Sequence, residues 1–226
     1  MRAQTLQAFT STNASSQMIC EIGKALPQIL NGDVEPLDVM MQDGLLTRTY
    51  SEDVGMRRTY PVMAKFASML SMTKILKVLE IGAGTGGATE HLLQAMSDDS
   101  HDPPRFLEYT YTDVTTGFFE EARNRFSRWS RRLRFAKLDV GEDPLKQGFE
   151  AASFDLIVAA NVLHATPDLH ATLKNTQSLL KPGGKLLLQE LIFHRPRFLP
   201  YSTLPGWWLS KDKLRSDNGP LLSVER

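Results

Sequence analysis

The chain has 226 residues, of which 42% are hydrophobic, and its 26 basic and 26 acidic side chains give a formal net charge of zero. This composition predicts a soluble globular protein, and the balanced charge excludes any electrostatic argument for nucleic acid or an anionic membrane as a partner. The single cysteine excludes an internal disulfide, and no apolar run approaches the roughly 18 residues of a membrane span. We therefore expect a cytoplasmic protein.

Residues 1–75 combine a polar tail with a helical pattern and no strand pattern. Met18 and Ile22 share a helical face before Pro27, which is expected to interrupt the helix. A short helix is expected from Pro36 to near Gly44, and prolines commonly occupy the first turn of a helix. A further helix is expected to begin at Pro61, with these residues on its apolar face: Val62, Phe66, Met69 and Leu70. This region is predicted to be a helical lid.

Residues 76–226 alternate between strand and helix patterns. Such alternation predicts a doubly wound, mostly parallel α/β sheet. Five strands are expected: 77–81, 107–112, 133–138, 154–159 and 185–192.

Three helices are expected between these strands. The first runs from about Gly87 to Met96. The second has core residues at helical spacing, namely Phe119, Ala122, Phe126 and Trp129. The third is expected to start at Thr166-Pro167 and to line one face with Leu169, Leu173, Thr176 and Leu180.

A glycine-rich loop follows the first strand and supplies the first candidate binding residues. Gly82, Ala83, Gly84 and Gly86 lie between an apolar strand and a helix start, where glycine lets the backbone approach a nucleotide-like ligand. With Gly87, the loop also fits the dinucleotide fingerprint, so a nicotinamide-dependent dehydrogenase is an alternative. Another alternative is a structural glycine turn beside solvated acids.

Acidic residues at three strand ends favour S-adenosylmethionine over a dinucleotide. Glu80 precedes the loop, where a carboxylate can organise the turn and approach the cofactor's amino-acid end. Asp113 ends the second strand, where an acid can hold ribose hydroxyls, and Asp139 ends the third, where it can accept from an adenine amino group. Acids suit a sulfonium cation better than a diphosphate. Leu138 and Asn161 complete the candidate cofactor contacts.

The segment 79–89 resembles the first motif of class I methyltransferases, most closely that of the C-methyltransferase domains in fungal highly reducing polyketide synthases. The other similar segments are 29–46, 111–119, 159–166, 181–190 and 204–209. This resemblance implies a Rossmann-like sheet and S-adenosylmethionine as cofactor. It also implies methylation of the α-carbon of a β-ketoacyl thioester on an acyl carrier protein, in polyketide biosynthesis.

His164 and Glu190 are the candidate catalytic pair. His164 follows the fourth strand and Glu190 lies at the end of the fifth, and these strands are neighbours in the usual class I order. The related domains use a His–Glu dyad at matching positions. Histidine can remove the α-proton, and a carboxylate orients it. The alternative is a helix-capping histidine and an ordinary ion pair. No residues have metal-ligand spacing, so no metal is expected.

Two further residues are candidates for contact with the substrate. Tyr50 lies on the expected lid, where it can donate a hydrogen bond, and Trp207 can form a wall of an acyl channel. Packing roles are the alternative for both.

Class I methyltransferases have two more strands after the fifth, and none is recognisable before Arg226. The sheet is therefore expected to lack its last two strands. This departure keeps open a truncated, non-catalytic remnant as an alternative function, alongside an O- or N-methyltransferase of a small molecule.

Overall fold

The computed structural model describes residues 7–97, 104–192, 196–212, 215, 220 and 221. Contacts divide the chain into two units, one made of residues 1–58 and 191–226 and the other of residues 59–190. The expected functional division into a lid at 1–75 and a core at 76–226 stays a prediction. Among the described residues, no helix is long and apolar enough to cross a membrane.

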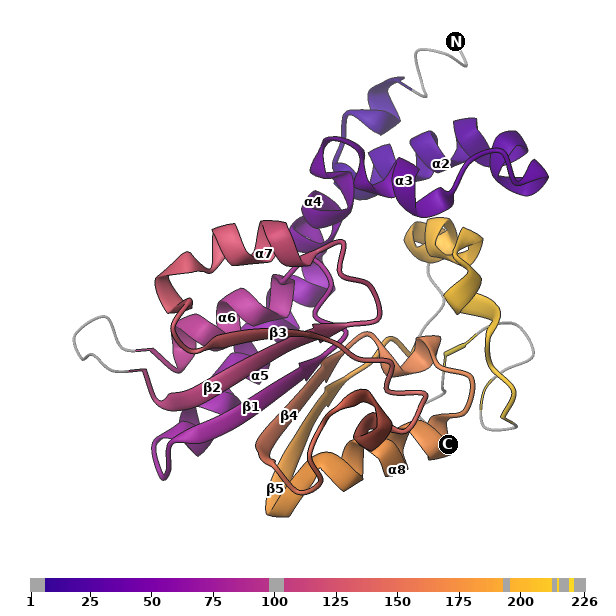
Figure 1. Cartoon of the computed structure of the whole chain (residues 1–226). Helices are drawn as coiled ribbons and strands as arrows, with labels where there is room; N and C mark the ends of the chain where they lie inside the picture. Colours follow the sequence, from indigo (N-terminus) through magenta and orange to yellow (C-terminus); the bar gives the residue numbers. More distant parts are fainter. Residues whose placement is uncertain (1–6, 98–103, 193–195, 213–214, 216–219, 222–226) are drawn as a thin grey trace. The chain divides into compact units, whose positions relative to one another are not determined.

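Five parallel strands form one sheet in the order β3-β2-β1-β4-β5 (Figure 1). Their bounds are β1 Leu76–Ile81, β2 Phe106–Asp113, β3 Leu133–Lys137, β4 Phe154–Ala160 and β5 Leu180–Gln189. The doubly wound α/β prediction is confirmed, and the first four strands match within one residue at each end. The strand order reverses direction between β1 and β4, which is where open α/β sheets bind ligands.

The fifth strand begins and ends earlier than predicted, since it spans Leu180–Gln189 instead of residues 185–192. Leu180 pairs with Phe154, and the chain rejoins β4 only at Lys185, which pairs with Leu156. The intervening Pro-Gly-Gly segment loops out, with Gly183 at a φ of +79°. The predicted start at Lys185 was wrong because a single pairing before the loop cannot be recognised from an apolar pattern.

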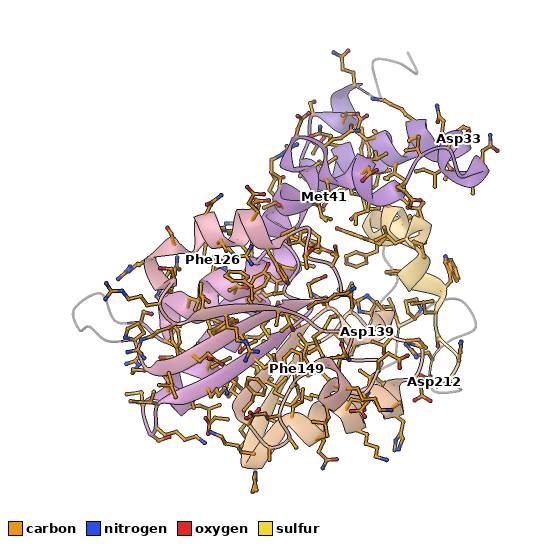
Figure 2. The ribbon with its side chains drawn as sticks, in the orientation of Figure 1. Asp33, Met41, Phe126, Asp139, Phe149 and Asp212 are labelled. Atoms are coloured by element: carbon orange, nitrogen blue, oxygen red, sulfur yellow. The ribbon has the colours of Figure 1, made fainter. Side chains whose placement is uncertain are left out.

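Helices α6 (Gly87–Ala95) and α7 (Phe119–Arg125) lie on one side of the sheet, and α8 (Leu169–Leu179) lies on the other (Figure 1). From β1 the chain adds β2 and β3 on one side, and from β4 it adds β5 on the other side. Because each crossover is right-handed, the helices of the two halves are placed on opposite faces of the sheet. The predicted core residues of α7 and the following turn η2 (Ser127–Trp129) are confirmed as buried, including Phe126 (Figure 2).

Helix α8 starts and faces differently from the prediction. Asp168, rather than Thr166, is its N-cap and accepts from the Ala171 N–H at 2.9 Å. Thr172 is buried while Leu173 is exposed, because the Thr172 hydroxyl is satisfied by the Thr166 hydroxyl at 2.9 Å. A short hydroxyl with internal partners can therefore replace leucine in this interface.

Helix α5 spans Val54–Ser71 and contains Pro61 in its interior, so the predicted start at Pro61 was wrong. Its predicted apolar face was also wrong. Val62, Phe66 and Met69 are exposed and Leu70 is only partly buried. The buried residues of α5 include Tyr60, Met63, Ala64 and Ala67. Both sets of residues have helical spacing, so the sequence pattern does not distinguish them. In the folded chain the face that contains the two alanines is the buried one.

The described part of the unit of residues 1–58 and 191–226 contains α-helices and 3₁₀-helices. These are α2 Ala14–Asn31, α3 Pro36–Met41, η1 Gln42–Gly44, α4 Leu45–Glu52, η5 Pro196–Thr203 and η6 Pro205–Trp208. Helix α2 continues through Pro27, contrary to the prediction, and ends at Gly32, whose φ is +78°. The Glu52 carboxylate accepts from the Ala14 N–H at 2.7 Å and so joins the ends of α2 and α4.

Candidate active site

The glycine loop joins β1 to α6 and is tied to β2. Gly82, Gly84 and Gly86 have φ values of +61°, +55° and +77°, and Gly86 is the N-cap of α6. The Ala83 N–H donates to the Thr112 carbonyl at 2.8 Å. The strand, turn and helix start predicted from these glycines are therefore confirmed.

Glu80 is fully buried beneath this loop. Its Oε2 accepts from the Thr89 hydroxyl and the Tyr109 hydroxyl, both at 2.6 Å, while its backbone carbonyl accepts from the Thr112 hydroxyl at 2.6 Å. Burial raises the pKa of the Glu80 carboxyl to about 7, although the Thr89 and Tyr109 hydrogen bonds oppose the shift. These contacts tie β1 to α6 and to β2 at the base of the loop, and the approach of Glu80 to a cofactor stays a prediction.

Asp113 joins the glycine loop to the end of β2. Its Oδ2 accepts from the Gly84 N–H at 3.0 Å, and its Oδ1 accepts from the Thr115 N–H at 3.1 Å. Burial raises the pKa of Asp113, and these backbone hydrogen bonds oppose the shift. The Leu138 N–H donates to the Asp113 carbonyl at 3.0 Å, which places these two candidate residues side by side.

Asp139, which is labelled in Figure 2, follows β3 and is exposed. Its Oδ1 accepts from the Gly141 N–H at 2.9 Å. The Gln147 side chain brackets its backbone, accepting from the Asp139 N–H at 2.9 Å and donating to its carbonyl at 2.8 Å. The carboxylate therefore keeps acceptor capacity at the carboxyl edge of the sheet.

Asn161 follows β4 in a left-handed conformation, with a φ of +57°. Its N–H donates to the Gln189 carbonyl at 2.7 Å. Both polar atoms of its side-chain amide are buried and have no hydrogen-bond partner within the described part of the chain. A buried amide without partners is costly, so this group is suited to a ligand.

His164 and Glu190 are in direct contact. The His164 Nδ1 lies 2.6 Å from Glu190 Oε2, and both side chains are mostly buried. Glu190 Oε1 accepts from the Leu163 N–H at 2.6 Å and from the Val162 N–H at 3.1 Å. Both carboxylate oxygens are therefore fixed, and the pair expected from neighbouring strand ends is brought together.

The N–H groups of Val162 and Leu163 were missed from the sequence. They belong to the start of a single turn, η4 (Leu163–Ala165), that carries His164. Every residue except proline has such a group, so no residue type marks this carboxylate-binding turn.

The two candidate substrate residues belong to the other unit. The Tyr50 ring stacks on Tyr201, with ring centroids 5.9 Å apart, and Trp207 is buried. Contact of Tyr50 and Trp207 with a substrate stays a prediction.

Comparison with known proteins supplies the family. Residues 79–186 match the model of a methyltransferase domain. The chain is 44% identical to the highly reducing polyketide synthase Preu5 of Preussia isomera over 224 residues, which are 98% of this chain and 9% of that synthase.

Two solved structures share the fold. The carbon methyltransferase of CurJ is 33% identical with a TM-score of 0.83, and the match covers 99% of this chain and 61% of that one. The trans-methyltransferase CalH, crystallised with SAH, is 31% identical with a TM-score of 0.81, and the match covers 92% of this chain and 59% of that one. The chain therefore spans about a tenth of the curated synthase and about three fifths of each solved methyltransferase.

Proposed function

The chain belongs to the methyltransferase domains related to polyketide synthases, and on that premise we propose that it methylates the α-carbon of a β-ketoacyl thioester. In this proposal the thioester is held by an acyl carrier protein, and the α-carbon reacts as an enolate. The observation that carries the proposal is the His164–Glu190 pair, with both carboxylate oxygens fixed.

The cofactor of these methyltransferases is S-adenosylmethionine. When bound, it supplies an electrophilic methyl group attached to a positively charged sulfur. Two features of the chain fit such a ligand. The buried Asn161 amide offers both a donor and an acceptor, and a Cβ at Gly84 would meet nothing closer than 3.9 Å, so the loop is open there.

The residues proposed to hold the cofactor lie at the carboxyl ends of β1 to β4. Asp113 and exposed Asp139 supply carboxylate oxygens, and the loop supplies backbone groups. Glu80 acts beneath them by shaping the turn. The full proposed set is Glu80, Gly82, Ala83, Gly84, Gly86, Asp113, Leu138, Asp139 and Asn161.

His164 is proposed as the general base. With its Nδ1–H donating to Glu190, the lone pair of the neutral imidazole lies on Nε2, which removes the α-proton. The positive charge that develops on the ring is then stabilised by the Glu190 carboxylate at 2.6 Å. Because Glu190 is already held by two N–H groups, it does not reorganise when the proton moves. General-base action typically supplies about 10²- to 10⁴-fold.

The experiment uses cofactor labelled in the methyl group and a β-ketoacyl thioester, presented on a carrier protein and as a small-molecule mimic. We expect label at the α-carbon with the native chain and a loss of about 10²-fold or more for His164→Ala. His170→Ala is the matched control, because His170 is an exposed histidine on α8 and should be silent.

The other outcomes separate the alternative functions. Label on oxygen or nitrogen would identify a different acceptor. Cofactor binding without transfer to any acceptor would identify a non-catalytic domain and refute the proposal.

A further inference from the structure

Gly82 is packed against Val162, a residue of the segment that leads to His164. A Cβ built at Gly82 would lie 2.2 Å from Val162 Cγ2 and 2.8 Å from Val162 Cβ. Real Cβ atoms essentially never show contacts under 3.0 Å, so the two side chains exclude each other. The space beside Gly82 is filled by protein.

Gly84 provides the contrast within the same loop. Its φ of +55° is close to the +61° of Gly82, but a Cβ there would meet only the Gly82 carbonyl oxygen at 3.9 Å. Both glycines therefore have a positive φ that favours glycine. Of these two positions, only Gly82 also lacks room for a Cβ.

Val162 is also bound to the catalytic pair through its backbone. Its N–H donates to Glu190 Oε1 at 3.1 Å, and the neighbouring Leu163 N–H donates to the same oxygen at 2.6 Å. The other carboxylate oxygen faces His164 Nδ1 at 2.6 Å. A displacement of Val162 thus moves a donor of the carboxylate that orients the base.

The segment has few ways to absorb such a displacement. On its amino side, Asn161 is in the left-handed region and its N–H is bonded to the Gln189 carbonyl at 2.7 Å. On its carboxyl side, the Ala165 N–H donates to the Val162 carbonyl at 3.0 Å and closes the turn. The contact with Gly82 is consequently transmitted to the turn that carries His164.

We infer that Val162 is a positioning residue, whose side chain rests on Gly82 and thereby holds the His164–Glu190 pair in place. The expected effect of Val162 on catalysis rests on the proposed function, in which His164 is the general base. Glycines in such loops usually allow the backbone to approach a ligand closely. Gly82 is instead assigned the role of leaving room for the side chain of Val162, in the segment that leads to His164.

The test compares Gly82→Ala, Gly84→Ala, Val162→Ala and the double variant Gly82→Ala/Val162→Ala. We expect Gly82→Ala to lower kcat by about 10²-fold, since misplacement by about 1 Å can have that effect, with a smaller change in KM for the cofactor. Gly84→Ala introduces a similar backbone strain without the clash, so it should keep the larger kcat of the two.

The double variant gives the decisive result. Alanine at 162 removes the atom at 2.2 Å and leaves a Cβ at 2.8 Å, so recovery will be partial, about tenfold in kcat relative to Gly82→Ala. If Gly82 is instead needed for close approach of the cofactor, the loss will lie in KM for the cofactor and Val162→Ala will restore nothing. That outcome would overturn the inference.

A second readout needs neither cofactor nor activity. The short His164 Nδ1–Glu190 hydrogen bond should give a strongly downfield imidazole N–H resonance in the proton NMR spectrum of the native chain. The resonance should weaken in Gly82→Ala and return in the double variant. Should Gly82→Ala fail to fold, Val162→Ala must restore folding by circular dichroism. Gly82→Ala is expected to lose activity, the resonance or folding. If Val162→Ala does not restore the lost property in the double variant, the inference is contradicted.

If the native chain does not methylate the thioester, the proposed function fails while the inference is still decided by the resonance. If the native chain methylates but the double variant shows no recovery, the inference fails and the proposed function stands.

Discussion

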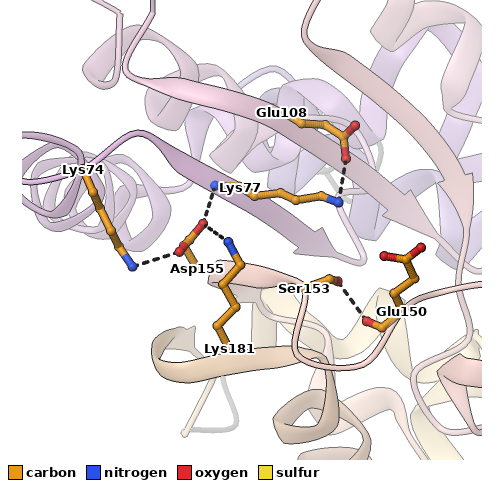
Figure 3. A network of polar contacts seen from close by, with 7 residues as sticks. All are labelled: Lys74, Lys77, Glu108, Glu150, Ser153, Asp155 and Lys181. Carbon is orange, nitrogen blue, oxygen red and sulfur yellow. Dashed lines mark hydrogen bonds and ion pairs between the residues drawn. The ribbon is translucent and has the colours of Figure 1, made fainter.

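The two ends of the sheet hold carboxylates in opposite ways. At the amino end, Asp155 on β4 accepts from Lys74 Nζ at 2.9 Å, Lys181 Nζ at 2.8 Å and the Lys77 N–H at 2.9 Å (Figure 3). At the carboxyl end, Glu80 and Glu190 are held by hydroxyl, N–H and imidazole groups. One end surrounds its carboxylate with cations, and the other uses donors without a fixed charge.

The consequence is visible in the pKa values of the two ends. Burial would raise the pKa of Asp155, but the hydrogen bonds from Lys181, Lys74 and the Lys77 N–H outweigh it and lower the pKa to about 2. Burial raises the pKa of Glu80 to about 7, because its hydroxyl partners compensate the lost hydration only in part. The Glu80 carboxyl can therefore respond to pH near neutrality, while the Asp155 carboxyl stays ionised there.

The largest expected effect concerns the carboxyl end and activity. Glu190→Gln keeps an oxygen for the Val162 and Leu163 N–H groups but places an amide NH₂ against His164 Nδ1. This favours the tautomer with its proton on Nε2, so we expect kcat to fall by about 10²-fold. Initial rates and calorimetric cofactor affinity are the measurements. An unchanged kcat would mean that Glu190 does not orient the base.

The next effect concerns Glu80 and stability. The pKa is 4.5 for an ordinary glutamate carboxyl and about 7 for Glu80 in the folded state. The resulting contribution to the free energy of unfolding is fully present below pH 4.5. About 3 kcal/mol of it is lost as the pH rises through about 7. Glu80→Gln keeps one oxygen for Thr89 and Tyr109 and removes the ionisation. Urea unfolding from pH 4.5 to 8 should show a flatter curve for the variant, and parallel curves would contradict the prediction.

The amino end should show the opposite dependence. Asp155 contributes stability above about pH 4, and the contribution is lost as pH falls towards 2, because the folded pKa is below the ordinary 3.8. Since both lysine side chains are partly exposed, we expect Asp155→Asn to reduce the free energy of unfolding by about 1–2 kcal/mol at pH 7. The difference from the native chain should shrink at pH 3, as measured by urea unfolding. A constant difference would point to packing instead.

The smallest expected effect is that of an exposed ion pair, which serves as a reference for the Asp155 cluster. Lys24 pairs with Glu21 at 2.8 Å on the exposed surface of α2. Lys24→Ala should leave the urea midpoint unchanged, because a solvated pair contributes little. A shift as large as that of Asp155→Asn would show that the amino-end cluster has no special role.

The failed predictions for the two helices that contain an interior proline share one physical cause. Pro27 and Pro61 were read as helix boundaries, yet α2 and α5 continue through them because packing of the whole helix outweighs a local loss. The choice between the two apolar faces of α5 depended on what the helix packs against. Neither outcome is present in a local pattern.

The sequence by itself determined the parallel sheet, the glycine loop and the positions of His164 and Glu190 at strand ends, because strands buried on both faces and residues at their carboxyl ends are readable in one dimension. Only the tertiary structure decided that Gly82 seats Val162, that two N–H groups fix Glu190, and that Glu80 and Asp155 have shifted pKa values of opposite sign. These properties depend on distances between segments far apart in the chain, and on the burial and charge of the groups that meet there.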